Sequence, residues 1–234
     1  MPAGQPAGMS MGACMNGYRF YWSIVWDALP LLLAGAWVTI QITILGFIVG
    51  TLIAMPMAVA RQRGEGWAYR FSTWWVELSR NTPAVFQLYL CYFGLGAFHI
   101  NVPSYAAVLM SVSFNNAGYM TEIFRGGLAA IPRQQLSASR SLGMTSPQSF
   151  IHVIFPQMFK VIFLAYVTQG IWGMLNTSLG MLVGLQELSG ATQYAQSTSF
   201  RTFEFFLVTA LIYYIIAKGL QFSSHLAFRL IYRS

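Results

Sequence analysis

Long stretches without a charged residue constrain this chain more than any other feature. Residues 28–60, 81–121 and 161–186 contain no Asp, Glu, Lys or Arg. About 20 apolar residues in a helix cross the roughly 30 Å of hydrocarbon in a bilayer, so each stretch is long enough to span a membrane. Apolar residues make up 56% of the chain and charged residues only 8%, far from the composition of soluble proteins. We therefore expect an all-α membrane protein.

The alternation of apolar stretches and polar turns predicts about five transmembrane helices in one domain of residues 28–229. The expected spans cover residues 29–60, 71–98, 105–124, 159–185 and 203–228. Pro83 lies within the second span, and because proline lacks a backbone N–H, this helix should bend or break there. Residues 1–27 are expected to form a periplasmic tail and residues 230–234 a cytoplasmic end.

The basic residues give the chain an orientation. Most Arg and Lys residues fall on one side of the five-span arrangement, whereas Arg19 and Arg201 fall on the other. Short loops rich in Arg and Lys stay in the cytoplasm, so the amino terminus is expected outside and the carboxyl terminus inside. The net charge of +7 follows from this topology. Without a basic cluster and interleaved aromatic residues, nucleic acid is not an expected partner.

The cytoplasmic loop of residues 126–157 is polar and is predicted to contain two short helices. Residues 137–142 are expected to form the first of them. Gly143 follows, and glycine permits the positive φ that a turn between two helices needs. Pro147 is expected to begin the second helix, with Ser146 as its N-cap.

This loop, with its Leu142-Gly143 pair and a later Phe155-Pro156, resembles the coupling loop of ABC importer permeases. Three blocks in order are similar to the polar amino acid uptake permeases: Val-Glu-Leu-Ser-Arg-Asn-Thr-Pro at 76–83, Ala-Gly-Tyr-Met-Thr-Glu-Ile-Phe-Arg-Gly-Gly at 117–127, and Asn-Thr-Ser-Leu at 176–179. The resemblance runs from about residue 37 to the end. It implies the type I ABC importer permease fold, with cytoplasmic coupling helices.

The resemblance also implies which residues meet an ATPase: Ser137, Ala138, Ser139, Leu142, Gly143 and Pro147. The substrate path is expected in the third and fourth spans, where polar residues interrupt apolar helices. Polar side chains inside a membrane must face protein or water. The expected path residues are Asn115, Asn116, Asn176, Thr177 and Ser178. Hydrogen bonding between helices is the alternative role for these side chains.

Two pairs of opposite charges are expected to be structural, together with Pro83. Glu77 and Arg80, and likewise Glu122 and Arg125, are three residues apart and would share a helix face. An unpaired charge at the bilayer centre costs roughly 2.5–3.5 kcal/mol, so pairing or a place near the interface is required. The second pair is expected to tie the third span to the coupling helices.

The chain departs from the family pattern in two places. Ser137-Ala-Ser139 stands where the family most often has Glu-Ala-Ala, and Leu175-Asn176 stands where many members have Lys-Asp. The loss of these charges favours one half of a heteromeric permease pair. Asn176 also favours glutamate or aspartate as substrate, because an Asp would repel an anionic side chain; basic amino acids remain open.

The resemblance implies a cytoplasmic ATPase dimer, a second permease subunit and a periplasmic or lipid-anchored binding protein, in a bacterial inner membrane. The chain has no glycine-rich phosphate-binding loop and no His, Cys or Ser/His/Asp arrangement, so we expect no ATPase, metal or cofactor site of its own. Two alternatives are a permease half that does not touch substrate and a stand-alone secondary carrier. The carrier would need acidic residues at the midplane, whereas the acids here lie mostly at span ends.

Overall fold

The computed structural model describes residues 20–232, and every regular element in that range is a helix, which confirms the all-α fold class. The α-helices are α1 (Trp22–Arg63), α2 (Gly66–Asn81), α3 (Ala84–Tyr89), α4 (Ser104–Ala129), α5 (Arg133–Ser141), α6 (Ser146–Ser149), α7 (Phe155–Asn176), α8 (Leu188–Ser199) and α9 (Thr202–Ile231). Single π-helical turns, Leu90–Gly94 and Phe150–Ile154, follow α3 and α6. A 3₁₀ helix, Thr177–Val183, continues α7.

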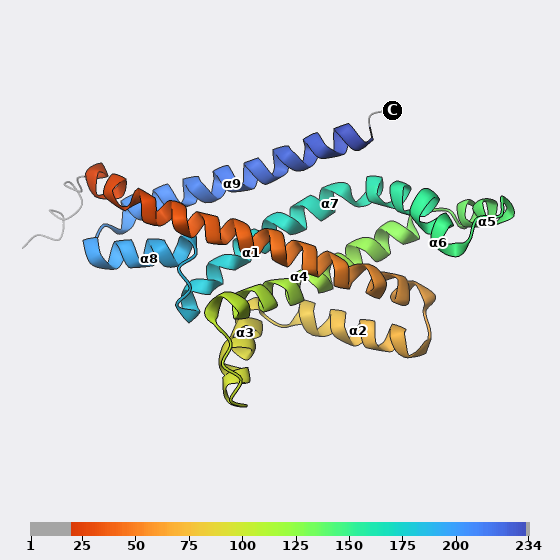
Figure 1. The fold of residues 1–234 in the computed structure, drawn as a ribbon, viewed down its shortest axis with the longest axis horizontal. Helices are drawn as coiled ribbons and strands as arrows, with labels where there is room; N and C mark the ends of the chain where they lie inside the picture. The colour runs from red at the N-terminus through yellow and green to blue at the C-terminus, as the bar shows by residue number, and fades with distance from the viewer. Residues whose placement is uncertain (1–19, 233–234) are drawn as a thin grey trace, which may run out of the picture.

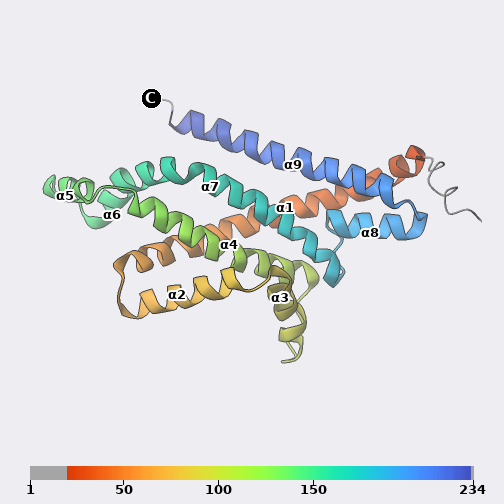
Figure 2. The same ribbon diagram turned by 180° about the vertical axis from the view of Figure 1, so that it is seen from behind.

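Helix α1 runs the length of the molecule, and the other long helices lie along it (Figure 1). The short helices α5 and α6 lie at the same end of the bundle as the last turns of α1 and α9. Helix α8 and the first turns of α1 lie at the opposite end, as the reverse view also shows (Figure 2). The bundle therefore has two ends, and the predicted coupling loop occupies one of them.

Small residues in α1 allow α4 to approach closely. Gly46, Gly50, Ala54 and Ala58 recur at every fourth position, on one face of the helix, and all are buried. A Cβ atom at Gly50 would lie 3.0 Å from the Cβ of Asn116. Helices in membranes associate through such small-residue faces, because lipid gives no hydrophobic drive for them to pack. The Gly46–Gly50 pair thus serves packing within the fold.

The chain breaks at Pro83, as the sequence predicts. Helix α2 ends at Asn81, and extended backbone at Thr82 and Pro83 leads into α3. Proline has no N–H to offer to the carbonyl of Ser79, four residues before it. The side chain of Gln87 replaces that donor, with Nε2 donating to Ser79 O at 2.8 Å and to Thr82 O at 3.1 Å. The amide of Asn115 in α4 also donates to Ser79 O, at 3.3 Å.

The second expected span is two helices, α2 and α3, and not one continuous helix. Helix α2 lies beside α1 and α4, whereas α3 projects across the long axis of the bundle (Figures 1 and 2). The extended backbone at Thr82 causes this change of direction, since it does not continue the helical path. By length and composition, three helices in the described part of the chain can span a membrane: Trp22–Arg63, Ser146–Val183 and Thr202–Ile231. Helix α4, with 26 residues, is packed between α1, α2 and α7.

The ends of the domain also differ from expectation. The expected tail of residues 1–27 is helical from Trp22 onward, and residues 1–19 lie outside the described residues. The expected cytoplasmic end, residues 230–234, is helical up to Ile231, and residues 233–234 are likewise outside the described part. The fourth span begins earlier than expected, because α6 and the π-helical turn lead without a gap into α7.

The polar stretch expected between the last two spans folds into α8. Its N-cap is Glu187, whose carboxylate accepts from the backbone N–H of Ser189 at 2.9 Å and of Gly190 at 2.8 Å. Thr39 in α1 and Tyr213 in α9 donate to the same carboxylate, at 3.4 and 3.0 Å. Glu187 is fully buried. A carboxylate with this many donors is satisfied inside the protein, and here it joins three helices.

Replacing Gly118 in α4 with Ala should lower the stability of the fold. The added Cβ would overlap the hydroxyl of Ser79 and lie 2.8 Å from its Cβ. Overpacking of this kind typically costs about 1–3 kcal/mol. Gly126→Ala, in the same helix, is the matched control, because no atom lies within 4 Å of its new Cβ. We expect a lower melting temperature in detergent for Gly118→Ala alone, measured by size-exclusion chromatography after heating; equal temperatures for both variants would contradict the close approach.

Candidate functional site

A cavity of about 590 Å³ lies at the broken end of α2, and residues of α2, α4 and α7 line it. Its polar lining comes from Arg80, Asn81, Thr82, Asn115, Tyr119, Gln169 and Asn176, with Trp172 beside them. Among the described residues that form this wall there is one cationic side chain and no carboxylate. The remaining polar groups are amides and hydroxyls, which both donate and accept hydrogen bonds. This lining can hold a carboxylate and offers no opposite charge to a cationic side chain.

Two of the expected path residues line this cavity. Asn115 comes from the middle of α4 and Asn176 from the last position of α7. Asn115 Nδ2 also donates to Gln87 Oε1 at 3.2 Å, in addition to its bond with the Ser79 carbonyl. The side chain of Asn115 therefore both repairs the break in α2 and contributes to the wall of the cavity.

The other three expected path residues do not line the cavity. Asn116 is buried behind it, and its Oδ1 accepts from Gln169 Nε2 at 2.9 Å, which orients the Gln169 side chain. Thr177 and Ser178 each donate to a carbonyl one turn earlier, to Met174 O and Leu175 O, both at 2.7 Å. Their hydroxyls are thus engaged by their own helix, where α7 tightens into the 3₁₀ turn. Such back-bonding is the ordinary behaviour of Ser and Thr in helices.

Sequence reasoning missed three residues of the cavity, Gln169, Tyr119 and Trp172, of which only Gln169 carries a readable signal. Gln169 interrupts the apolar run 161–186, and Tyr119 lies one helical turn beyond Asn115. Trp172 is 59% exposed on α7, about one turn before that helix ends at Asn176. The polar interruptions of α7 were a sufficient reason to include Gln169 with Asn176. Tyr119 and Trp172 could not be distinguished from aromatic residues that face lipid.

Four charged side chains meet where α1, α2 and α4 come together. The carboxylate of Glu122 accepts three hydrogen bonds from Arg125, from Nε to Oε1 at 3.2 Å and to Oε2 at 3.1 Å, and from Nη2 to Oε2 at 2.9 Å. Arg61 of α1 reaches the same carboxylate at 3.2 Å, and Arg80 of α2 lies 4.0 Å from it. The expected Glu122–Arg125 pair is therefore present, but it ties α4 to α1 and α2 and not to the coupling helices.

The expected Glu77–Arg80 pair is wrong. Glu77 accepts instead from Asn81 Nδ2 at 2.6 Å. Arg80 lies over the ring of Tyr119, 5.2 Å from its centroid, and turns toward Glu122 and the cavity. A helix face shared at a spacing of three permits a pair but does not require one, and here α4 offers Arg80 other partners. Among residues 20–232, no three His, Cys, Asp or Glu side chains gather closely enough to hold a metal ion.

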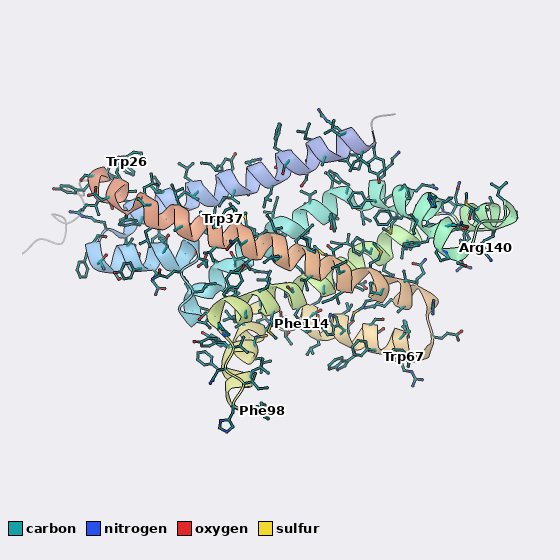
Figure 3. All side chains as sticks on the ribbon, viewed as in Figure 1. Trp26, Trp37, Trp67, Phe98, Phe114 and Arg140 are labelled. Carbon is teal, nitrogen blue, oxygen red and sulfur yellow. The ribbon has the colours of Figure 1, made fainter. Side chains whose placement is uncertain are left out.

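Helices α5 and α6 form the tip of the molecule at the end reached by α4 and α7, beside the labelled Arg140 (Figure 3). Arg140 Nη1 donates to Met144 O at 2.6 Å and so closes the turn between the two helices. Gly143 has φ +82°, which confirms the expected left-handed turn. Leu142, next to it, is 80% exposed. Ser139 is buried, whereas Ser137 and Pro147 are exposed.

The N-cap of α6 is Thr145 and not Ser146, one residue earlier than expected. Thr145 Oγ1 accepts from the backbone N–H of Gln148 at 3.4 Å, and Gln148 Oε1 accepts from the backbone N–H of Thr145 at 2.8 Å. This reciprocal pair needs Gln or Glu three residues after the cap, which Thr145 has and Ser146 does not. Helix α5 likewise begins earlier than expected, at Arg133.

Residues 46–229 match the family described as "Binding-protein-dependent transport system inner membrane component". The chain is 31% identical to the glutamine transport system permease protein GlnP of Escherichia coli strain K12, over 87% of this chain and 94% of the relative. It is 30% identical to the L-cystine transport system permease protein TcyB of Bacillus subtilis strain 168, over 92% and 93% of the two chains.

Solved structures agree with these relatives. A chain from the crystal structure of an amino acid ABC transporter with histidines superposes with a TM-score of 0.80 at 27% identity, covering 91% of this chain and 99% of the other. The methionine transporter MetNI shares the fold, with a TM-score of 0.73 at 20% identity. Because the family match spans most of the sequence and the relatives cover nearly their whole length, the chain belongs to the binding-protein-dependent transport system inner membrane components, the permease subunits of ABC importers.

Proposed function

We propose that this permease imports a polar amino acid by ATP-driven alternating access, and that the ATPase is a separate subunit. The substrate would pass the cavity at the broken end of α2, and the ATPase would dock on the tip formed by α5 and α6. The observation that carries this proposal is the separation of the two features along the bundle, a cavity with a polar lining inside and, at one end, a polar tip that exposes the apolar side chain of Leu142. Binding of ATP to the docked ATPase would then shift the permease between a conformation open to the outside and one open to the inside.

Leu142 supports docking at the tip. This apolar side chain at the turn between α5 and α6 is 80% exposed, so the described residues cover little of it. Gly143 beside it holds the left-handed conformation that brings the two short helices together. We propose that Leu142 inserts into the ATPase, with Ser137, Ala138, Ser139, Gly143 and Pro147 shaping the surface around it.

The lining of the cavity supports a substrate with a carboxylate and no net positive side chain. Arg80 offers the charge, and Asn115, Gln169 and Asn176 offer amide hydrogen bonds. Glutamate or aspartate fits this set. One carboxylate of the substrate would bind Arg80, and the other would accept hydrogen bonds from the amides. Glutamine, the substrate in the name of GlnP, would use the same amides. A basic amino acid would lack an opposite charge in the described wall.

The remaining partners follow from the family. We propose a second permease subunit around a pseudo-two-fold axis, an ATPase dimer and a periplasmic or lipid-anchored binding protein, in a bacterial inner membrane. The amino terminus would lie outside, because α1 ends in Arg61 and Arg63 at the end of the bundle that carries the tip. One observation favours a rival role. Asn115 and Asn116 are both committed to internal hydrogen bonds, as expected of a permease half that does not contact substrate.

The function is tested by ATPase activity in proteoliposomes that contain this chain, its partner permease and its ATPase. Activity is compared with and without the binding protein and each of glutamate, aspartate, glutamine and arginine. Stimulation by one ligand, accompanied by its uptake, would support the importer and name its substrate. Uptake that is indifferent to ATP would favour a stand-alone carrier. Stimulation that survives removal of the cavity amides would favour the permease half that does not bind substrate.

Arg80→Gln should lower uptake by about tenfold or more at a saturating concentration of loaded binding protein. Hydrogen bonds to charged groups contribute about 1.5–3 kcal/mol, and each 1.4 kcal/mol corresponds to about tenfold. Arg70→Gln is the matched control, because Arg70 is an exposed cation of the same helix outside the cavity. Assembly of the complex and its basal ATPase activity should be unchanged in both variants. Equal uptake by the two variants would remove Arg80 from the path.

Leu142→Glu should prevent the ATPase from co-purifying with the permease, because the exposed apolar contact becomes a charge. Leu142→Met keeps an apolar side chain of similar size and should retain the ATPase. Gly143→Val should weaken ligand-stimulated ATPase activity, since a β-branched residue resists φ +82°, while Gly143→Asn should be tolerated better. If Leu142→Glu binds the ATPase as well as Leu142→Met does, the tip is not the docking surface.

A further inference from the structure

A second cavity of about 580 Å³ lies where the coupling helices α5 and α6 meet the last turns of α1 and α4. Its wall is mainly apolar, and Leu128, Ile131, Phe150 and Ile154 contribute to it. The tip residues Leu142 and Gly143 are not part of this wall. Of the residues proposed above to form the docking surface, only Pro147 contributes to this wall, so the apolar interior of the cavity has no assigned role.

Two arginines lie at the edge of this apolar cavity. Arg63 is the last residue of α1, and Arg133 is the first residue of α5. Both are exposed, and neither forms an ion pair with an acidic side chain within residues 20–232. Arg61, two residues before Arg63, differs in this respect because it binds Glu122. The cavity thus combines apolar walls with two cations that have no anionic partner in the described part of the chain.

The cavity lies at the level where lipid headgroups are expected. Helix α1 carries its apolar span up to Ala60 and then reaches Arg61 and Arg63. Trp67, in the first turn of α2, is 81% exposed and points away from the bundle at this end (Figure 3). Tryptophan and arginine next to an apolar span mark the boundary between hydrocarbon and water.

We propose that this cavity binds an anionic phospholipid. An acyl chain fills the apolar part between α1, α4 and α6, and the phosphate binds between Arg63 and Arg133. Basic pockets between transmembrane helices on the cytoplasmic side are suited to anionic headgroups, and the apolar wall distinguishes a lipid from free phosphate. The bound lipid connects the coupling helices to the end of α1. The proposal rests on the membrane placement of the chain and is independent of the transported substrate.

The test is native mass spectrometry of the full-length chain released from detergent, with phosphatidylglycerol or phosphatidylcholine of identical acyl chains. We expect the wild type to retain one phosphatidylglycerol in preference to phosphatidylcholine. Each arginine near a membrane surface contributes about fivefold to the affinity for anionic lipid, so Arg63→Gln with Arg133→Gln should weaken retention by more than tenfold. Arg63→Lys with Arg133→Lys should retain the lipid. Arg70→Gln with Arg229→Gln, which removes two other exposed basic residues, should behave as wild type.

The other arms separate the alternatives. Glycerol phosphate, which has the headgroup chemistry without acyl chains, should not displace the retained lipid. If glycerol phosphate does displace the lipid, the ligand of this cavity is a free phosphate compound and not a lipid. Equal retention of both phospholipids, or equal loss in the two glutamine variants, would overturn the proposal. So would a loss of ATPase binding in Arg63→Gln with Arg133→Gln that occurs in lipid-free detergent, because the cavity would then belong to the ATPase interface.

Discussion

The structure depends on how the broken end of α2 is satisfied inside a membrane. A free carbonyl in hydrocarbon costs several kcal/mol, because no water is present to bind it. The carbonyl of Ser79 has no backbone donor four residues later, because residue 83 is a proline. It accepts instead from the side-chain amides of Gln87 and Asn115. These bonds fix the end of α2 against α4. Because the end is fixed, Arg80, Asn81 and Thr82 remain in place as one wall of the cavity.

Close approach between helices brings the other walls to the cavity. The small-residue face of α1 lets α4 lie near the centre of the bundle, and Gly118 lets α2 lie against α4 at Ser79. On the side of α7, Gly173 leaves room for the amide of Asn116, which holds Gln169. The side chains of Asn115, Gln169 and Asn176 thus line one cavity with Arg80, because three helices each contribute a position without a Cβ or with a small side chain.

The sequence was sufficient for the fold class, the break at Pro83, the positive φ of Gly143 and the Glu122–Arg125 contact. The fold class follows from the long uncharged stretches, and the other three features depend on one residue or on two residues that are three apart. Partners that come from other helices could not be predicted. Gln87 is one ordinary polar residue in an apolar stretch until α2 ends beside it, and the partner of Arg80 is Glu122, far away in the sequence. Glu187 seemed to be a loop residue, and only the fold shows that Thr39 and Tyr213 surround it.

The four-charge cluster connects the cavity to the end of the bundle that carries the tip. Glu122 can neutralise one cation fully, yet three arginines surround it, so they cannot all be held equally. Arg125 donates three charge-assisted hydrogen bonds and Arg61 lies at 3.2 Å, while Arg80 lies at 4.0 Å and is the most weakly held of the three by geometry. Arg80 is also the only one of them that lines the cavity. Loss of the contact between Glu122 and Arg80 would therefore leave α1 and α4 joined through Arg61, with Arg125 still bound to Glu122.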